Sequence, residues 1–420
     1  MDPFDEMNKR YFEELLNIFP PSHLPINEEA DLKIVYTAMH GVGFPFVEKA
    51  FEITKLKPVF AVVEQRDPDP EFPTVKFPNP EEGKSCLALS MNLADEVESN
   101  LILANDPDAD RLACAEREST SGQWKVFNGN ELGTLLGWWA VQYFKEKNSG
   151  SELRNCHILA STVSSKMLRS MAKVDGFNFE ETLTGFKWMG NRSVELMHAG
   201  KEVLFAYEEA IGFMFSPAVL DKDGVSAAAH LATMASYLKV KENMSLAQKL
   251  DQLYITYGYH FSINSYFLCY EPVKIVQVFE KIRNWEGKTG EYPTSVLNGK
   301  YKIASIRDLT TGVDTAQTDR KSLLPASKSS QMITFTLENG TVITLRTSGT
   351  EPKIKYYSEY CAKPEETWEA CDTLLIKILI KRIFYYSDWC LVQEKLKEIV
   401  DGLVNELLQP QENELIPRLD

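Results

Sequence analysis

Residues 100–116 read NLILANDPDADRLACAE, an apolar run followed by three alternating aspartates, Asp106, Asp108 and Asp110. Carboxylates this close repel one another unless a cation lies among them. The run NLILA is typical of a short buried strand that delivers the aspartates to a loop at its end. Because α/β folds carry their functional sites in loops at strand ends, this stretch predicts an α/β domain with a cation site in that loop.

Two other carboxylate motifs fit this loop poorly. An EF-hand needs Gly at its sixth position and Glu at its twelfth, where this chain has Arg111 and Arg117. A phosphatase of the DxDx(T/V) type needs Thr or Val in place of Asp110. We therefore predict a Mg²⁺ site formed by Asp106, Asp108 and Asp110, with Arg111 bound to a phosphate oxygen. An acidic capping turn paired with a surface arginine is the alternative.

Strands and helices alternate on both sides of this loop. Residues 1–30 contain a predicted helix over 8–19 and a proline-rich linker. A first α/β unit over 31–150 and a second over 151–258 follow, each with a mixed or mainly parallel sheet. The expected strands are 32–36, 58–63, 100–104, 156–161 and 202–207, and the expected helices are 87–97, 131–147, 163–174 and 187–198.

The third unit, residues 259–420, has a different order of elements. Asn339-Gly340 lies between two alternating apolar runs, which is a strong signal for a β-hairpin. We expect helices over 273–285 and 391–408, so the predicted fold class of this unit is α+β. Residues 366–390 form an atypical segment within this unit.

Composition limits the possible function classes. The chain has 420 residues, which favours about three domains. Its net charge of -15 argues against a general nucleic-acid or membrane binder. The seven cysteines form no CxxC pair, so we expect small apolar residues and no disulfide or zinc framework. No signal peptide is visible, and we expect a cytoplasmic protein.

The stretch RTSGTEPKIKYY, residues 346–357, is the second candidate site. A guanidinium, two hydroxyls and a glycine that admits close approach are the groups of an anion nest. Lys353 and Lys355 add positive charge in an acidic protein. We predict a phosphate site, and a Ser-Gly turn between two strands is the alternative. The predicted phosphate-binding residues are Arg346, Ser348, Gly349, Thr350 and Lys355.

Two further stretches complete the candidate residues. Glu208 and Glu209 follow an apolar strand, where paired acceptors suit sugar hydroxyls; a solvated acidic turn is an equally good interpretation. In LTGFKWMGN, Lys187 is a candidate substrate contact, and Trp188 is expected in the core. His40 is expected to be structural.

The four loops, in this order, resemble those of the α-D-phosphohexomutase superfamily. The phrases NPEEGKS, NDPDADRLA, ETLTGFKWMGNR and SKSSQMITFT resemble the phosphoglucomutase-2, or phosphopentomutase-type, branch and its relative glucose 1,6-bisphosphate synthase. The resemblance implies an isomerase that transfers a phosphoryl group between carbon 1 and carbon 5 or 6 of ribose, deoxyribose or glucose phosphates. It further implies a phosphoserine, Mg²⁺, a sugar bisphosphate as activator, and a mostly monomeric state.

The resemblance also assigns roles. Asp106, Asp108 and Asp110 would bind Mg²⁺, and Arg111 would contact the phosphoserine. Glu208 would bind sugar hydroxyls. The residues implied at the non-reacting phosphate are Arg346, Ser348, Gly349, Thr350 and Lys355, the last where the family often has Arg.

Three departures from the family pattern affect the expected function. Ala210 stands where many members have Ser, which is consistent with a pentose phosphate. Residues 366–390 do not resemble the family's C-terminal domain. The family's serine loop, TASHN, is absent from the 420 residues, and residues 1–30 resemble the end of its first domain. We therefore expect a truncated form with three of four domains and little activity alone. A non-catalytic phosphosugar-binding or regulatory form, or a glucose 1,6-bisphosphate synthase, is the alternative.

Overall fold

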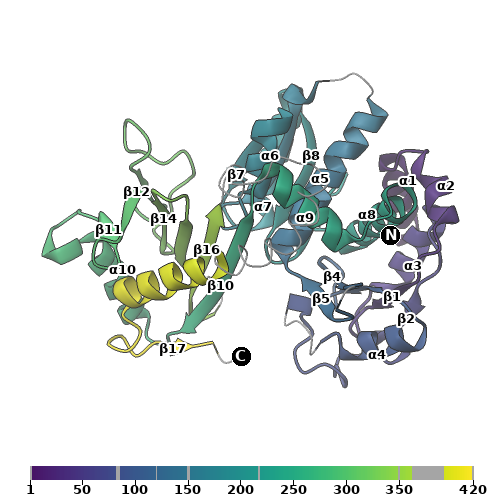
Figure 1. The fold of residues 1–420 in the computed structure, drawn as a ribbon, viewed down its shortest axis with the longest axis horizontal. Coiled ribbons are helices and arrows are strands. Elements are labelled where there is room, and N and C mark those ends of the chain that lie inside the picture. Colours follow the sequence, from purple (N-terminus) through teal and green to yellow (C-terminus); the bar gives the residue numbers. More distant parts are fainter. Residues whose placement is uncertain are drawn as a thin grey trace, which may run out of the picture. The chain divides into compact units, whose positions relative to one another are not determined.

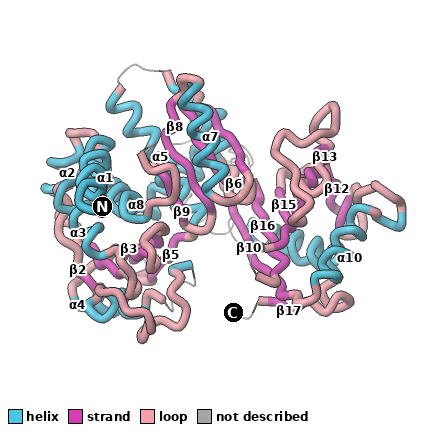
Figure 2. Tube along the Cα trace, turned by 180° about the vertical axis from the view of Figure 1, so that it is seen from behind, coloured by secondary structure: helices cyan, strands magenta, loops and turns pink. Residues whose placement is uncertain are grey.

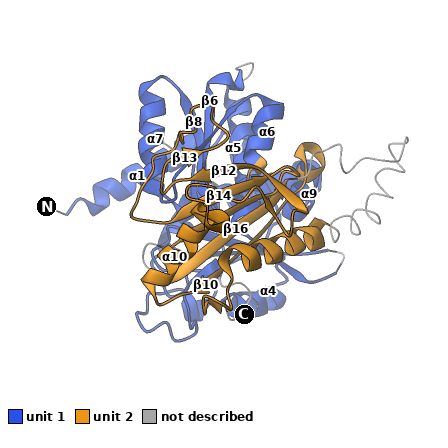
Figure 3. Ribbon diagram, turned by 90° about the vertical axis from the view of Figure 1, so that its left-hand side faces the viewer, with its two compact units in different colours: residues 1–164, 168–253 blue, residues 165–167, 254–420 orange. Residues whose placement is uncertain are grey.

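The computed structural model describes residues 2–81, 86–119, 121–148, 152–215, 218–348, 351–361 and 392–418. It divides into two compact units: unit 1 is residues 1–164 and 168–253, and unit 2 is residues 165–167 and 254–420 (Figure 3). Unit 1 contains two mixed sheets with helices, and unit 2 contains an antiparallel sheet with helices. The predicted fold class is therefore confirmed. The atypical segment 366–390 lies outside the described residues.

Two helices precede the first sheet of unit 1. Helix α1 (Phe4–Ile18) begins earlier than predicted and buries Phe12 and Leu15. A second helix, α2 (His23–Glu29), lies within the predicted proline-rich linker. Pro25 is tolerated because it lies in the first turn, where backbone N–H groups have no partner within the helix.

The first sheet has the order β2-β1-β3-β4-β5 (Figure 1). Strand β1 pairs in parallel with β2 and β3, whereas β3, β4 and β5 pair antiparallel. Every residue of β3 is buried, as its apolar sequence predicts. The predicted strand over 58–63 shortens to a two-residue edge strand. The elements are β1 (Ile34–Thr37), α3 (Phe44–Ile53), β2 (Phe60–Ala61), η1 (Val63–Gln65), α4 (Ala88–Glu96), β3 (Leu101–Asn105), β4 (Leu112–Arg117) and β5 (Trp124–Phe127).

The second sheet of unit 1 has the order β7-β6-β8-β9, with only the β8–β9 pair antiparallel. Helices α5 and α7 pack against β8 (Figure 1). Helix α5 begins at a capping box in which Asn128 and Glu131 satisfy each other's backbone N–H groups. The elements are α5 (Gly129–Lys147), η3 (Leu153–Asn155), β6 (Cys156–Ser161), α6 (Met167–Asp175), β7 (Asn178–Thr182), α7 (Phe186–His198), β8 (Glu202–Glu208) and β9 (Gly212–Met214).

Helix α6 begins four residues later than predicted. Ser164 donates its backbone N–H to Ser161 O at 2.9 Å, and the two hydroxyls lie 2.7 Å apart. Serine side chains that bond to nearby groups compete with helix formation. Residues 162–165 therefore form turns at the end of β6.

Helix α8 (Gly224–Tyr237) connects the two sheets of unit 1. It contacts β3 and β4 of the first sheet and β9 of the second. Its N-cap, Asp223, accepts hydrogen bonds from the Ser226 N–H at 2.9 Å and from the Tyr11 hydroxyl at 2.9 Å. The π-turn η4 (Leu238–Glu242) and α9 (Leu246–Tyr257) follow. Among the described helices, none combines the length and apolar character needed to cross a bilayer.

Unit 2 is built on the sheet β11-β12-β14-β15-β16-β10-β17, with β13 paired to β12 (Figure 2). The predicted hairpin at Asn339-Gly340 is confirmed: β14 and β15 pair antiparallel, and Gly340 has φ +87°. The elements are β10 (His260–Leu268), α10 (Pro272–Arg283), η5 (Trp285–Gly287), β11 (Ser295–Val296), β12 (Tyr301–Asp308), β13 (Val313–Asp314), β14 (Met332–Leu337), β15 (Val342–Thr347), β16 (Lys353–Cys361), a helix over 392–408 and β17 (Ile416–Pro417).

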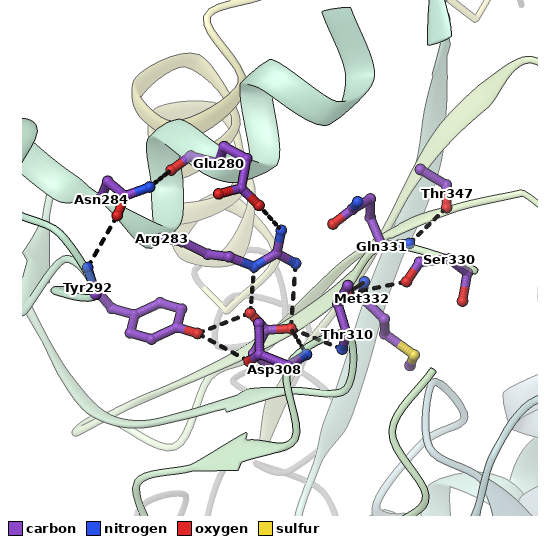
Figure 4. A network of polar contacts seen from close by, with 12 residues as sticks. Glu280, Arg283, Asn284, Tyr292, Asp308, Thr310, Ser330, Gln331, Met332 and Thr347 are labelled. Atoms are coloured by element: carbon purple, nitrogen blue, oxygen red, sulfur yellow. Dashed lines mark hydrogen bonds and ion pairs between the residues drawn. The ribbon is translucent and has the colours of Figure 1, made fainter. Parts of the chain in front are cut away.

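A buried ion pair connects α10 to β12 (Figure 4). Arg283 Nε lies 2.6 Å from Asp308 Oδ2, and both side chains are almost fully buried. The Tyr292 hydroxyl and the Thr310 N–H also donate to the Asp308 carboxylate, each at 2.8 Å. Burial alone raises the pKa of Asp308, but these hydrogen bonds and the Arg283 charge hold it below its ordinary value.

Candidate active site

The three predicted aspartates lie together in the loop between β3 and β4. One carboxylate oxygen from each of Asp106, Asp108 and Asp110 lies within 4.8 Å of the other two. Ala109, between the last two, has φ +58°, a left-handed conformation that tightens the loop. The alternating spacing in the sequence therefore becomes a single cluster of oxygen ligands.

The aspartates differ in their surroundings. Asp106 is buried and accepts hydrogen bonds from the Arg111 N–H at 3.0 Å and from Arg111 Nε at 2.5 Å. Burial raises the pKa of Asp106 to about 6, although the Arg111 charge opposes the rise. Asp110 pairs with Lys222 at 3.1 Å. Asp108 is exposed, and its carboxylate has no hydrogen bond or ion pair within the described residues.

This oxygen cluster fits Mg²⁺, the metal that the superfamily implies. Carboxylate oxygens are the ligands of hard cations, and Mg²⁺ keeps several positions for water or phosphate. Burial raises the pKa of the Asp106 carboxyl, and a cation bound beside it would oppose this rise as the Arg111 charge does. We infer that Asp106, Asp108 and Asp110 would hold the ion.

Arg111, the predicted phosphate contact, is held within the same loop. Besides Asp106, its guanidinium lies 3.2 Å from Asn79 Oδ1 and 3.7 Å from Glu81 Oε2. The side chain is 26% exposed, so part of the guanidinium reaches solvent. The contact to a phosphate stays a prediction.

The aspartate loop adjoins the β8–β9 hairpin, which carries the predicted sugar-binding residues. Arg111 forms an isolated bridge with Gly212, and the Leu112 N–H donates to Ile211 O at 3.0 Å. The N–H of Gly224, at the start of α8, donates to Ala109 O at 3.1 Å. Unit 1 therefore joins two of the loops that the sequence singled out.

The two glutamates of this hairpin are held by different elements. Glu208 Oε1 accepts a hydrogen bond from the Gly185 N–H, which connects it to the loop before α7. Glu209 Oε2 accepts from the hydroxyls of Ser161 at 3.0 Å and Ser164 at 3.3 Å. Both side chains are half-buried, and their sugar-binding role stays a prediction.

Lys187 and Trp188 lie in the first turn of α7. Lys187 Nζ is 5.9 Å from the Trp188 ring centroid. Trp188 is 38% exposed, so the expectation that it lies in the core is wrong. The next residue, Met189, is fully buried and belongs to the core together with Phe186 and Leu196 of the same helix. His40 is buried and bonds through Nε2 to the Thr74 hydroxyl at 2.7 Å, as expected of a structural histidine.

Sequence reasoning missed two residues that position the aspartate loop. Lys222 forms an ion pair with Asp110. Burial lowers the pKa of Lys222, but the negative charges of Asp110 and Asp221 hold it above its ordinary value. Gly224 lies against the loop backbone: a Cβ there would be 2.4 Å from Arg111 O and 2.7 Å from Ala109 O. The sequence signal that could have pointed to both residues is the stretch DKDG, residues 221–224.

Gly224→Ala is expected to displace the aspartate loop. The added methyl group meets two backbone carbonyls, so unfolding should cost about 1–3 kcal/mol less, and Mg²⁺ affinity should fall. Calorimetric Mg²⁺ titration and thermal unfolding measure both effects. Ala228→Gly, in the same helix, is the control because it weakens α8 by about 1 kcal/mol without pressing on the loop. Unchanged Mg²⁺ affinity in Gly224→Ala would show that the close packing does not position the aspartates.

The predicted phosphate residues of unit 2 lie at the ends of β15 and β16. Arg346 and Lys355 stand directly opposite each other in the antiparallel register, and both are half-buried. Like charges in that position are destabilising unless an anion lies between them. The Ser348 N–H donates to Lys353 O at 3.0 Å, which closes the turn. Gly349 and Thr350 lie outside the described residues, so their predicted role is untested.

Comparison with protein families places these loops in a known context. The description "Phosphoglucomutase/phosphomannomutase, alpha/beta/alpha domain II" matches residues 9–121, and that of domain III matches residues 128–257. Together the matches take in more than half of the chain, which belongs to the phosphoglucomutase/phosphomannomutase family of the α-D-phosphohexomutase superfamily. Its relatives include proteins of the phosphopentomutase type.

Two curated human proteins are similar to this chain. Phosphopentomutase is 57% identical over 364 residues, which cover 86% of this chain and 58% of the relative. Glucose 1,6-bisphosphate synthase is 50% identical over 418 residues, which cover 99% of this chain and 63% of the relative. The chain thus spans about three fifths of the length of these relatives.

Solved structures support the same fold. Parafusin, a phosphoglucomutase from Paramecium, aligns with a TM-score of 0.63 at 19% identity, covering 96% of this chain and 62% of that chain. A putative phosphomannomutase from Thermus thermophilus aligns with a TM-score of 0.56 at 17% identity, covering 86% of this chain and 63% of that chain.

Proposed function

We propose that this chain contributes to the activity of a phosphosugar mutase, an enzyme that moves a phosphoryl group between carbon 1 and carbon 5 or 6 of a sugar phosphate. The observation that carries the proposal is the cluster of three aspartate carboxylates within 4.8 Å, in a loop joined to the hairpin that holds Glu208. Phosphoryl transfer depends mainly on positioning and charge neutralisation, which such a cluster provides when it holds a divalent cation.

We assign the chain's own residues the following work. Glu208 accepts hydrogen bonds from sugar hydroxyls. Glu209, the next residue along the chain, and Lys187, in the first turn of α7, are further proposed substrate contacts. Bound Mg²⁺ would supply charge neutralisation at a phosphate oxygen, held by Asp106, Asp108 and Asp110. The groups proposed for the non-reacting phosphate are Arg346, Ser348, Gly349, Thr350 and Lys355.

Arg111 has the role of contacting the phosphate that is transferred. Its planar guanidinium matches phosphate oxygens, and its ion pair with Asp106 fixes its orientation. In the family this phosphate is carried by a serine in the sequence TASHN, which does not occur in the 420 residues. We therefore propose that residues 1–420 by themselves bind phosphosugars but turn them over slowly, because binding and electrostatics remain without the nucleophile.

A coupled mutase assay on the 420-residue chain tests this proposal. The substrates are ribose 1-phosphate and glucose 1-phosphate, each with Mg²⁺ and catalytic glucose 1,6-bisphosphate, and human phosphopentomutase is the reference. We expect turnover below about 1% of the reference, since removal of a nucleophile costs several orders of magnitude. Turnover close to the reference would contradict the dependence on a serine outside these residues.

A second candidate function is that of a non-catalytic phosphosugar-binding or regulatory protein. The absence of the TASHN sequence from the 420 residues favours it. The match over 418 residues to glucose 1,6-bisphosphate synthase favours a third, synthesis of the bisphosphate. Product analysis separates them: a mutase converts one monophosphate into the other, a synthase accumulates bisphosphate, and a binding protein does neither.

The substrate is proposed to be a pentose phosphate. Ala210 stands where many family members have a serine, so one hydroxyl that could recognise a hexose is missing. Calorimetry with ribose 1-phosphate and glucose 1-phosphate checks this preference.

We further propose a cytoplasmic monomer whose partners are sugar phosphates, with no nucleic acid or membrane.

A further inference from the structure

A second cluster of metal-ligating side chains lies in unit 2, on strands β10 and β16. Its members are His260, Glu359 and Cys361, and one ligand atom from each lies within 4.8 Å of the other two. His260 and Cys361 are direct partners in the antiparallel register, and Glu359 lies two residues before Cys361 on the same face. The register of the sheet brings together residues separated by about a hundred positions in the sequence.

One carboxylate oxygen of Glu359 has no hydrogen-bond partner in the part of the chain that the structure describes. Glu359 is only 6% exposed, and its Oε2 accepts hydrogen bonds from the Lys166 N–H at 2.8 Å and from Cys361 Sγ at 3.4 Å. Its Oε1 is buried and has no hydrogen-bond partner among the described residues. An unpaired buried carboxylate oxygen is costly, and a bound ion or water is the usual explanation.

His260 has the arrangement that a metal-binding histidine commonly shows. Its Nδ1 lies 3.1 Å from Gly258 O, a distance at which Nδ1–H donates to that carbonyl. In this tautomer the lone pair is on Nε2, and a backbone carbonyl orients the ring. His260 is 6% exposed, so the ring is also fixed by its surroundings.

We propose that His260, Glu359 and Cys361 bind a divalent transition metal of the zinc class. One nitrogen, one sulfur and one carboxylate oxygen suit Zn²⁺, whereas Mg²⁺ and Ca²⁺ prefer oxygen ligands alone. With three protein ligands the fourth tetrahedral position is left to water or a small ligand. Binding replaces the proton of the Cys361 thiol with the metal and releases that proton to solvent.

Cobalt titration of the metal-free chain tests the proposal. The protein is dialysed against EDTA and titrated with Co²⁺, whose bond to a thiolate gives a charge-transfer absorption band. We expect one equivalent of Co²⁺ with this band, and Zn²⁺ should displace it. Asp108→Asn should keep the band, because the aspartate loop has no sulfur ligand. Absence of the band at about 0.1 mM Co²⁺ would overturn the proposal and indicate that water satisfies Glu359 Oε1.

Three variants and one control identify the ligands. Cys361→Ser should abolish the band, and Glu359→Gln and His260→Asn should each weaken Co²⁺ binding at least about 10-fold. Cys269→Ser is the matched control, since Cys269 is another thiol of unit 2 outside the cluster. Circular dichroism checks folding of each variant, and Cys361→Ser is the mildest change. A band that persists in folded Cys361→Ser, or that is lost in Cys269→Ser, would contradict the assignment.

Discussion

Replacing Asp108 with Asn is expected to lower the Mg²⁺ affinity of the chain by about 100-fold or more. Loss of a residue that only supports a metal ligand costs about 10- to 100-fold in affinity, and loss of a direct ligand should cost at least as much. The carboxylate of Asp108 is exposed and bonds to no other described residue, whereas its oxygen lies within 4.8 Å of those of Asp106 and Asp110. The substitution therefore removes a charged ligand without removing a contact that stabilises the fold.

Calorimetric titration with Mg²⁺ measures this loss, and thermal unfolding should show little change in the absence of the ion. Asp31→Asn is the matched control, because Asp31 is an exposed aspartate of unit 1 outside the loop. If Asp108→Asn binds Mg²⁺ as tightly as the parent chain, the aspartate loop is not the metal site.

Asp308→Asn should lower the free energy of unfolding of unit 2 by about 3 to 5 kcal/mol, the usual result of removing one partner of a buried ion pair. Arg283 is only 5% exposed, so its charge would be left buried without compensation. Because the folded-state pKa of Asp308 lies below its ordinary value of 3.8, the stabilisation is present above that value and is lost as the pH falls through the folded-state pKa.

Denaturant unfolding between pH 3 and pH 7 measures both effects. The parent chain should lose stability at the acidic end of this range, and Asp308→Asn should lose less. Asp319→Asn, an exposed aspartate whose carboxylate only caps a turn, should behave as the parent. A loss below about 1 kcal/mol for Asp308→Asn would contradict the importance of the buried pair.

Local chemistry in the sequence predicts much of this fold. Asn339-Gly340 specifies the β14–β15 hairpin because Gly340 adopts a positive φ. The apolar run at 101–105 gives a buried strand. The prediction of α6 is wrong at its start, because hydrogen bonds of Ser161 and Ser164 form a turn where the apolar pattern predicts helix. The helix α2 was not predicted, because Pro25 is tolerated in its first turn although proline usually breaks a helix.

The candidate site is only partly visible in the sequence. The alternating aspartates predict their own cluster, because all three lie in one loop. Lys222 and Gly224 escape notice because their contacts with that loop join elements distant in the sequence. The pairing of His260 with Cys361 depends on the register of β10 and β16, which no local pattern specifies.

The most direct measurement is calorimetric titration of the 420-residue chain with glucose 1,6-bisphosphate, with and without Mg²⁺. We predict binding that requires Mg²⁺ and that Asp108→Asn and Arg346→Ala each weaken at least about 10-fold, as expected for the loss of a charged contact. Arg320→Ala, an exposed arginine of unit 2, is the control. Binding that is absent, or that is unaffected by Mg²⁺ and by both variants, would contradict the proposed phosphosugar site.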